Sequence, residues 1–459
     1  MSPLVRIRLP AGAPRPSSGE QRGHGAAPRV YLETFGCQMN EADSALIAGR
    51  LAHAGYQRVD DPASADVVLI NTCAIREKAE DRVWGRTSQL LRHRKENPAL
   101  VVGITGCMAE HLREKVAERA PYIALVAGPD SYRDIAALVD RARAGERVVD
   151  VTLDRTEVYE GLDGLPDDDG VSGHVTIQRG CDKFCTFCVV PYTRGRERGV
   201  PPREVLRSVR RLAERGYREV VLLGQTVNSY RHEDVDFADL VRAVAEVPGI
   251  ARVRFTSPYP VDVSDALVRA LAEVPQLCPQ VHLPVQSGSD AVLARMRRGY
   301  DRAGFLDVVA RLRAAVPDIA LSTDVLVGFC GETEDDHRRT LELMDEVRFD
   351  MAFMFAYSDR GITSAARKLA DDVPPAIKQR RLQEVIDRQE THTRASYAKM
   401  VGRTVEVLIG GPGRRGDCLV GRTPHFQNVV MPMDAGRRGE LVRVDVVSTT
   451  GHSLLAARA

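Results

Sequence analysis

The feature that most constrains the fold is a repeated alternation of short apolar runs and amphipathic segments between Arg29 and about Ala144. Short apolar runs predict buried strands, and apolar residues at helical spacing predict that the segments between them are helices. The predicted strands are 30–32, 67–70 and 100–104, and the predicted helices are 42–54, 77–94 and 109–119. This rhythm predicts a parallel sheet covered by helices.

One cysteine follows each of these predicted strands, at Cys37, Cys73 and Cys107. Their separations of 36 and 34 residues are each close to one strand–helix unit. Because the carboxyl ends of parallel strands lie at one edge of a sheet, we expect the three sulfurs to meet there. Buried packing is the alternative for scattered cysteines. Each cysteine follows a small residue that would let the backbone approach an inorganic cluster: Gly36, Thr72 and Gly106.

A second set of three cysteines, Cys181, Cys185 and Cys188, has the spacing C-x3-C-x2-C. A closed zinc site needs four protein ligands, and an all-cysteine 4Fe-4S cluster needs a fourth thiolate. No further cysteine or histidine follows closely, so each set is one ligand short and leaves a position for another molecule. A structural zinc loop is the alternative for this second set.

The second set, with Phe187 between its last two cysteines, resembles the radical S-adenosylmethionine superfamily. That resemblance implies a 4Fe-4S cluster whose open position is filled by S-adenosylmethionine, with the aromatic ring near the adenine. The flanks of the first set resemble the amino-terminal domain of the radical S-adenosylmethionine methylthiotransferases: Thr34–Asn40, Asn71–Ala79 and Gly106–Met108. In that family these three cysteines hold an auxiliary 4Fe-4S cluster linked to sulfur delivery, so the implied cofactors are two 4Fe-4S clusters and S-adenosylmethionine.

Strands and helices alternate again after an acidic stretch rich in proline and glycine at 163–170, which predicts an interdomain linker. The repeat predicts a partial or complete (β/α) barrel with its site at the carboxyl ends of the strands. The predicted strands are 175–178, 219–223, 252–256, 281–283, 320–327 and 352–355, and the predicted helices include 202–215, 237–245 and 263–272.

Polar and glycine residues at these strand ends are candidates for binding S-adenosylmethionine. A single such residue is also explained by turn formation, so the prediction depends on the whole set. His282 is either a site residue or a hydrogen-bonded core residue. Together with Phe187, the candidates are Gly224, Gln225, Ser257, Gln286 and Asp324.

The last part of the chain, after a charged helical stretch at 377–399, has short strand patterns separated by glycine-rich turns and predicts a small β-barrel. The predicted strands are 404–409, 417–420, 429–431 and 441–447. From Gly402 to Ala459 there are eight arginines, no lysine and five acidic residues, a local charge of +3 within a chain of net charge +1. Position and strand pattern resemble the TRAM domain, an RNA-binding barrel. An ordinary solvated basic face is the alternative. The candidates for phosphate contact and base stacking are Arg414, Arg415, Arg422 and Phe426.

The composition is that of a globular protein, and no apolar stretch approaches the roughly 18 to 20 residues that a membrane span needs. Residues 1–27 have no uninterrupted apolar segment of an export signal, so we expect a cytoplasmic protein with no membrane partner. A reducing compartment favours metal ligation over disulfides for the nine cysteines. The three outside the two sets are predicted to be small buried hydrophobes: Cys278, Cys330 and Cys418.

We therefore predict an α/β fold class with three domains. An amino-terminal parallel-sheet α/β domain is followed by a central radical S-adenosylmethionine (β/α) barrel and a small carboxyl-terminal β-barrel. The predicted boundaries are a disordered tail at 1–28, the methylthiotransferase amino-terminal domain at 29–145, a linker at 146–172, the radical S-adenosylmethionine core at 173–395 and the TRAM domain at 396–459.

The resemblance implies methylthiolation of carbon 2 of N6-isopentenyladenosine next to the anticodon of tRNA. In the implied scheme one cluster passes an electron into S-adenosylmethionine to give a radical, the other presents a methylated sulfur, and a second S-adenosylmethionine supplies the methyl group. The implied partners are tRNA carrying isopentenyladenosine, an electron donor and a source of sulfur or of cluster repair. The segments Ala74–Lys78 and Pro191–Gly195 resemble the isopentenyladenosine branch of the family.

Three other functions stay open at this point. Two are methylthiolations of other substrates, threonylcarbamoyl-adenosine in tRNA or an aspartate of a ribosomal protein. The third, from a different class, is a non-catalytic iron–sulfur protein that binds RNA through the basic barrel.

Overall fold

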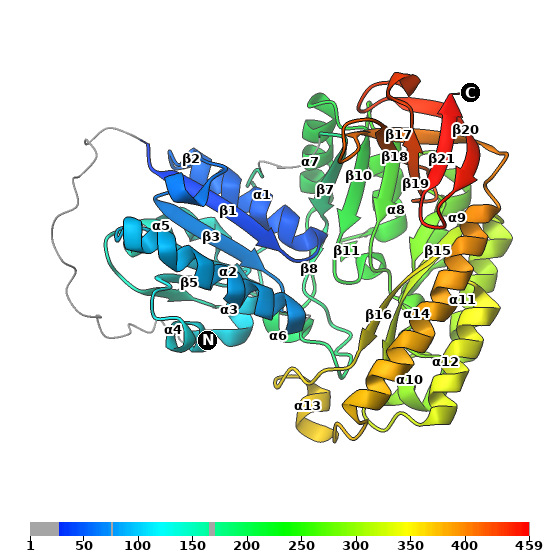
Figure 1. The fold of residues 1–459 in the computed structure, drawn as a ribbon, viewed down its shortest axis with the longest axis horizontal. Coiled ribbons are helices and arrows are strands. Elements are labelled where there is room, and N and C mark those ends of the chain that lie inside the picture. Colours follow the sequence, from blue (N-terminus) through cyan, green and yellow to red (C-terminus); the bar gives the residue numbers. More distant parts are fainter. Residues whose placement is uncertain (1–26, 75–76, 165–169, 459) are drawn as a thin grey trace. The chain divides into compact units, whose positions relative to one another are not determined.

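The computed structural model describes residues 27–74, 77–164 and 170–458. Nearly all of the predicted tail at 1–28 lies outside these ranges, as does part of the predicted linker. The described residues form two compact units (Figure 1). The first unit holds the described residues before position 168 together with 179–182 and 189–198. The second unit holds residues 170–178, residues 183–188 and the described residues from 199 onward. No helix in the described ranges is long and apolar enough to cross a membrane.

The first unit is built on a six-stranded parallel sheet with the order β2-β1-β3-β4-β5-β6. Strands β3 and β4 are buried along their whole lengths, which explains why they read as continuous apolar runs. Strand β6 lies inside the range 146–172 and pairs with β5. The strands are β1 (Arg29–Phe35), β2 (Gln57–Arg58), β3 (Val67–Thr72), β4 (Val101–Gly106), β5 (Leu125–Ala127) and β6 (Val148–Asp150).

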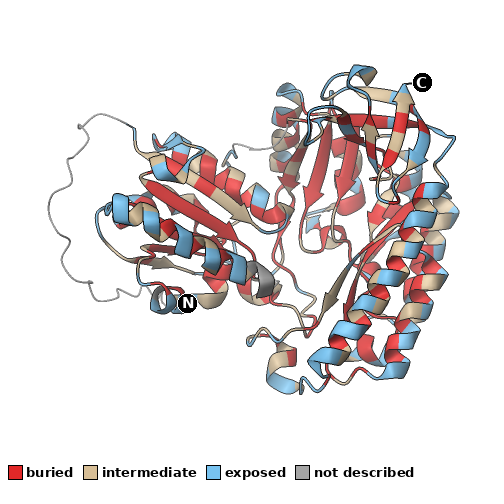
Figure 2. Ribbon diagram, in the orientation of Figure 1, coloured by how far each residue is buried: buried red, intermediate tan, exposed pale blue. Residues whose placement is uncertain are grey.

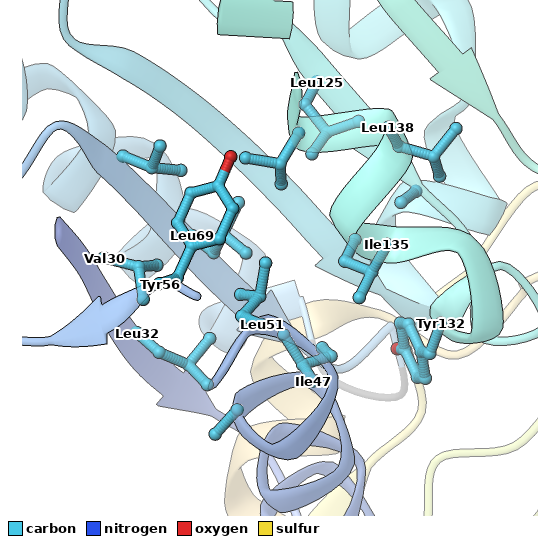
Figure 3. Packing of buried hydrophobic residues seen from close by; sticks show 14 of the residues in the cluster. Val30, Leu32, Ile47, Leu51, Tyr56, Leu69, Leu125, Tyr132, Ile135 and Leu138 are labelled. Atoms are coloured by element: carbon cyan, nitrogen blue, oxygen red, sulfur yellow. The ribbon is translucent and has the colours of Figure 1, made fainter. Parts of the chain in front are cut away.

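Helices cover both faces of this sheet (Figure 1). On one face Ile47 and Leu51 pack with Ile135 and Leu138 over the strands (Figure 3). The predicted helix 109–119 is two short helices, because Arg113 between them has a left-handed φ of 51°, which an α-helix cannot contain. The helices are α1 (Gln38–His53), α2 (Glu77–Glu96), α3 (Cys107–Leu112), α4 (Glu114–Arg119) and α5 (Ile135–Arg143).

The second unit contains an open (β/α) barrel, made of two parallel sheets with the orders β13-β10-β7 and β14-β15-β16. An isolated bridge between Val253 and Leu277 joins the segment of β13 to the chain that leads into β14. The buried strands lie inside helices whose outer faces are exposed (Figure 2). The strands are β7 (Ser172–Thr176), β10 (Glu219–Leu223), β13 (Arg252–Phe255), β14 (Gln280–His282), β15 (Ala320–Val327) and β16 (Met351–Ala356).

The barrel helices alternate with these strands as the repeat predicts. They are α7 (Pro202–Glu214), α8 (Phe237–Ala245), α9 (Asp265–Glu273), α10 (Asp290–Met296), α11 (Arg302–Ala315), α12 (Glu334–Val347) and α14 (Pro375–Ala398). Shorter elements are β8 (Gln178–Arg179), α6 (Val190–Thr193), β9 (Arg198–Gly199), β11 (Arg231–His232), β12 (Val235–Asp236) and α13 (Ser364–Lys368).

The chain ends in a closed five-stranded barrel with the order β17-β18-β19-β21-β20. Strand β21, absent from our prediction, closes it by pairing in parallel with β19 and antiparallel with β20. Tyr397, near the end of α14, joins the apolar core of this barrel. The strands are β17 (Thr404–Pro412), β18 (Leu419–Arg422), β19 (Asn428–Met431), β20 (Leu441–Thr449) and β21 (Leu454–Arg458).

Strand β13 of the open barrel is attached to the closed barrel by two arginines. Arg252 Nη1 donates to the carbonyl of Arg422 at 2.7 Å. Arg254 Nη1 and Nη2 donate to the carbonyls of Pro424 and Thr423, both at 2.8 Å. Arg254 Nε also donates to Glu219 at 2.7 Å in a buried ion pair.

Arg254→Ala is therefore expected to lower the free energy of unfolding by about 3–5 kcal/mol, because it leaves Glu219 as an uncompensated buried carboxylate. Urea unfolding of the full chain measures the change. The matched control is Arg242→Ala, whose ion pair with Glu273 is exposed and is expected to contribute less than about 1 kcal/mol. Equal effects of the two substitutions would contradict the role given to Arg254.

Candidate metal centres and cofactor site

The first cysteine set lies where the order of the first unit's sheet changes direction. Cys37 follows β1, Cys73 follows β3 and Cys107 follows β4. Thr72 pairs with Phe35 on one side and with Gly106 on the other, so Cys73 and Cys107 each come one residue after a row of paired residues. In doubly wound sheets ligands bind in the crevice at this switch point.

The three thiols differ in exposure and in acidity. Cys37 is exposed at the N-cap of α1, while Cys73 and Cys107 are buried. A hydrogen bond with Cys73, supported by the charge of Arg194, lowers the pKa of Cys37 to about 6. Burial raises the pKa of Cys107, and the nearby Arg194 opposes that rise. A low thiol pKa favours the thiolate, which is the form that binds metals.

Two buried asparagines fix the loops that carry these sulfurs. Asn40 Nδ2 donates to Asn71 Oδ1 at 3.2 Å, and Asn71 Nδ2 donates to the carbonyl of Asn40 at 2.8 Å. A Cβ on Gly36 would collide with the Asn40 side chain, and a Cβ on Gly106, whose φ is 92°, would collide with Asn71. These two glycines are thus required by packing within the protein itself.

The donor set is compatible with an iron–sulfur cluster. Within the described part of the chain, no group of three or more histidine, cysteine or carboxylate residues is arranged to hold one metal ion. A cubane cluster spreads its thiolates over separate irons, so its ligands need not converge on one point. Three thiols at a sheet edge, two of them joined by a hydrogen bond, are compatible with that requirement.

A residue that the sequence analysis did not select reaches Cys107. Arg194 Nε donates a hydrogen bond to Cys107 Sγ at 3.1 Å across 87 positions of sequence. Arg194 also donates from Nη2 to the buried Asp43 at 2.8 Å. No local pattern marks such a long-range contact, although Arg194 lies in a segment that resembles the methylthiotransferases.

The second cysteine set is divided between the two units. Cys181 belongs to the first, where its N–H donates to the carbonyl of Gly195 at 3.2 Å. Cys185 and Cys188 belong to the second, where the N–H of Cys188 donates to the carbonyl of Cys185 at 3.0 Å. The intervening Thr186 fixes this turn, since its N–H donates to Met296 at 3.0 Å.

A second unpredicted arginine contacts this set. Arg298 Nη1 donates to Cys185 Sγ at 3.3 Å and Nη2 donates to the carbonyl of Pro284 at 3.0 Å. The buried guanidinium lies 4.8 Å from the ring centroid of Tyr259 and 5.4 Å from that of Tyr300. Arg298 therefore ties Cys185 to the loops that follow β13 and β14.

Three of the candidates for S-adenosylmethionine binding lie just past β10 and β13. Gly224 and Gln225 directly follow β10, and Gln225 Oε1 is a buried acceptor without a hydrogen-bond partner among the described residues. Ser257 lies two residues past β13 with a left-handed φ of 55°. Such backbone strain and unsatisfied acceptors concentrate at binding sites, so this edge fits a polar ligand.

The other candidates lie on the second sheet of the open barrel. Gln286, past β14, has a φ of 72°, and its N–H donates to the carbonyl of Asp324 in β15 at 2.8 Å. Asp324 also faces His282, whose Nε2 lies 3.5 Å from its carboxylate. Phe187 packs edge-on to Phe329 with the ring centroids 6.4 Å apart. The structure thus groups Gln286 with Asp324 and His282, and places Phe187 against a separate apolar cluster.

The candidates for RNA contact fall at two different turns of the closed barrel. Arg414 and Arg415 are exposed between β17 and β18. Phe426 lies with its ring centroid 4.3 Å from the guanidinium of Arg422 and 5.1 Å from that of Arg254. Phe426 therefore takes part in the attachment of the closed barrel to β13, while Arg414, Arg415 and Arg422 are exposed to solvent.

Two family models match the chain. Residues 29–128 match the model described as uncharacterized protein family UPF0004, and residues 175–344 match the radical SAM superfamily. The first range contains Cys37, Cys73 and Cys107, and the second contains Cys181, Cys185 and Cys188.

Curated relatives match over almost their whole lengths. The chain is 45% identical over 427 residues to the tRNA-2-methylthio-N(6)-dimethylallyladenosine synthase of Pelodictyon phaeoclathratiforme. The matched region covers 92% of this chain and 97% of the relative. It is 44% identical over 437 residues to the enzyme of the same name from Porphyromonas gingivalis, covering 93% and 94%.

Solved structures with a similar fold have low sequence identity. The radical S-adenosylmethionine methyltransferase TsrM from Kitasatospora setae is 15% identical with a TM-score of 0.53, covering 72% of this chain and 73% of that one. The cobalamin-dependent S-adenosylmethionine radical enzyme OxsB is 13% identical with a TM-score of 0.54, covering 80% and 57%. These likenesses support the fold alone.

Proposed function

The chain belongs to the family of tRNA-2-methylthio-N(6)-dimethylallyladenosine synthases, and from this membership we propose that it transfers a methylthio group to carbon 2 of N6-isopentenyladenosine next to the anticodon of tRNA. The observation that carries the proposal is the identity of 45% spread over 97% of a relative's length. A match that covers 92% of this chain extends well beyond residues 175–344, which match the radical SAM superfamily.

The radical domain implies S-adenosylmethionine and one 4Fe-4S cluster, and we propose a second cluster on the first cysteine set. Bound together, S-adenosylmethionine and a reduced cluster supply a radical able to remove hydrogen from an aromatic C–H carbon that polar reagents do not attack. We assign the cluster of the radical domain to the second cysteine set, which is Cys181, Cys185 and Cys188. We assign the additional cluster to the first cysteine set, which is Cys37, Cys73 and Cys107.

The chain's own residues bind and orient the reactants. In this proposal Gly224, Gln225, Ser257, Gln286 and Asp324 hold the nucleoside and methionine parts of S-adenosylmethionine, and Phe187 lies beside the adenine. The unpartnered acceptor on Gln225 and the left-handed backbone of Ser257 and Gln286 support this assignment. Arg298 holds Cys185 in place by its hydrogen bond to the sulfur.

We propose that the closed barrel contacts the tRNA backbone through Arg414 and Arg415, which are exposed at one turn. Each turnover consumes a sulfur atom and electrons, so the cycle also needs an electron donor and a source of sulfur or of cluster repair. Because mature tRNA is the substrate, we expect the protein to act in the cytoplasm.

The test is mass spectrometry of nucleosides from the tRNA of a strain that lacks this gene. We expect the methylthio mark to disappear from isopentenyladenosine while the isopentenyl group stays, because only the last modification step is removed. The gene returned on a plasmid is expected to restore the mark, and a Cys185→Ala copy serves as the matched control that does not.

Other outcomes of this experiment would assign a different substrate. Loss of the methylthio group from threonylcarbamoyl-adenosine, with the isopentenyladenosine mark intact, would contradict the proposal and favour that modification. If the tRNA profile is unchanged and an aspartate of a ribosomal protein loses its methylthio group, the substrate is that protein and the proposal is contradicted.

A further inference from the structure

A buried group of charged side chains connects Cys107 to the interior of the first unit. Arg194 Nε donates to Cys107 Sγ at 3.1 Å, and its Nη2 donates to Asp43 Oδ2 at 2.8 Å. The other oxygen of Asp43 accepts from Arg179 Nη2, also at 2.8 Å. Both arginine side chains are 4% exposed and that of Asp43 is fully buried.

This group carries an excess positive charge. A second buried ion pair, Arg198 with Asp130 at 2.9 Å, adjoins it, and Arg198 Nη2 also donates to the carbonyl of Arg194 at 2.8 Å. Within this group three arginines face two aspartates, and the further acidic groups next to Arg194 include the thiols of Cys107 and Cys37, which are candidate ligands of the first cysteine set. Because a buried charge without a partner is costly, an anionic group next to Arg194 would stabilise the arrangement.

The guanidinium of Arg194 also has a donor to spare. Its Nη1 is buried and has no hydrogen-bond partner among the residues that the structure describes. A buried donor of this kind costs free energy until an acceptor satisfies it. The sulfurs of an inorganic cluster are both anionic and able to accept hydrogen bonds, so one bound group would meet both requirements.

We propose that Arg194 is a positioning residue for the group held by Cys37, Cys73 and Cys107, which fixes Cys107 and compensates the negative charge of that group. The inference rests on the proposed function, which gives these cysteines a 4Fe-4S cluster. Hydrogen bonds to ligand sulfur and nearby positive charge both stabilise the reduced, more negative state of a cluster. Arg194 is therefore expected to raise the reduction potential of this cluster.

Asp43 has a distinct part in this arrangement. Its two oxygens bind the guanidinium groups of Arg194 and Arg179 separately, so the carboxylate fixes the direction in which Arg194 presents its Nε–H. Arg179 is fixed in turn, since its guanidinium lies 4.4 Å from the ring centroid of Tyr159. A lysine at position 194 could keep the charge but could not reproduce the planar fork that binds Asp43 and Cys107 at once.

The experiment uses the full chain with Cys181, Cys185 and Cys188 replaced by alanine, so that only the first cysteine set can hold a cluster. This parent and its Arg194→Gln and Arg194→Lys derivatives are loaded with iron and sulfide without oxygen. Bound iron is counted, and the midpoint potential is measured by redox titration followed by electron paramagnetic resonance.

In Arg194→Gln we expect the ratio of reduced to oxidised cluster at a given potential to fall at least tenfold, a shift of about 59 mV to lower potential for one electron. Arg194→Lys is expected to shift less. The matched control is Arg133→Gln, which removes a partly exposed arginine of the same unit that pairs with Glu157. This control is expected to keep the potential of the parent.

Each outcome decides for or against the inference. Loss of iron from a folded Arg194→Gln protein, with iron retained by Arg133→Gln, would also support it. Arg194 variants that bind as much iron as the parent, at the same potential, would overturn it. If circular dichroism shows that Arg194→Gln is unfolded, Arg194→Lys decides by the same criterion.

A parent protein that holds no 4Fe-4S cluster would overturn the proposed second cluster together with this inference. The iron count of the parent shows this before any Arg194 variant is compared.

Discussion

Replacement of Cys185 by alanine is expected to abolish reductive cleavage of S-adenosylmethionine. Loss of an outer partner of a metal ligand typically costs about 10- to 100-fold in affinity or activity, so removal of the ligand itself is expected to cost at least about a hundredfold. Bound iron is expected to fall from about eight to about four per chain, because the first cysteine set is untouched. Formation of 5′-deoxyadenosine from S-adenosylmethionine and dithionite measures the reaction.

The matched control for this substitution is Cys418→Ala. Cys418 belongs to neither cysteine set and lies directly before β18, so its removal is expected to change neither iron content nor cleavage. It is only partly buried, whereas Cys278 and Cys330 are buried as predicted. Wild-type protein that holds iron but never cleaves S-adenosylmethionine would favour the non-catalytic RNA-binding function. A Cys185→Ala protein that still cleaves it would show that this thiol is not a ligand.

Replacement of Cys107 by alanine is expected to separate the two halves of the chemistry. Sulfur insertion into tRNA should be lost, again by at least about a hundredfold, because the first set would keep only two thiolates. Cleavage of S-adenosylmethionine should stay within about twofold of the wild-type rate, since the second set is complete. Parallel assays of 5′-deoxyadenosine and of methylthiolated nucleoside measure the two quantities.

The comparison of Cys107→Ala with Cys185→Ala tests the division of labour more sharply than either variant alone. Full thiolation by Cys107→Ala would show that the first set has no part in sulfur delivery. Loss of cleavage in Cys107→Ala would show that the two sets do not act separately. Cys418→Ala again provides the reference for removal of a thiol outside both sets.

Local patterns predicted the regular parts of the fold well. Strand β10, helix α8 and strand β15 begin and end at the predicted residues, because each is a strongly patterned segment with clear turn signals on both sides. The parallel sheet of the first unit and the small closed barrel at the end of the chain were predicted correctly. The same patterns placed each of the first three cysteines after a strand.

Features without a local pattern were missed. Strands β5 and β6 are three residues long, too short for a periodicity, and β21 is a short run of two leucines and two alanines before an arginine, without alternation of apolar and polar residues. The break at Arg113 depends on a single left-handed residue that has no glycine to mark it. The space that Gly36 and Gly106 provide is taken by Asn40 and Asn71, a packing relation visible only in three dimensions.

The contacts of Arg194 and Arg298 with cysteine sulfurs could not be predicted from the sequence. Arg194 and Cys107 are 87 positions apart, and Arg298 and Cys185 are 113 apart. Nothing in the residues around an arginine tells which distant sulfur it will contact, because that contact is produced by the tertiary fold. Among a basic set of 64 lysines and arginines, charge alone could not select them.

The attachment of the closed barrel has a consequence for how the molecule can be divided. Tyr397, at the end of α14, is part of the core of that barrel, and Arg252 and Arg254 donate to main-chain carbonyls at 422–424. A truncation after position 395 would separate Tyr397 from most of the helix that carries it and would leave Arg252 and Arg254 of the other fragment without their main-chain acceptors. The closed barrel therefore cannot be excised without losing its contacts to β13, and the tRNA contact proposed for it is better tested by point substitution at Arg414 and Arg415.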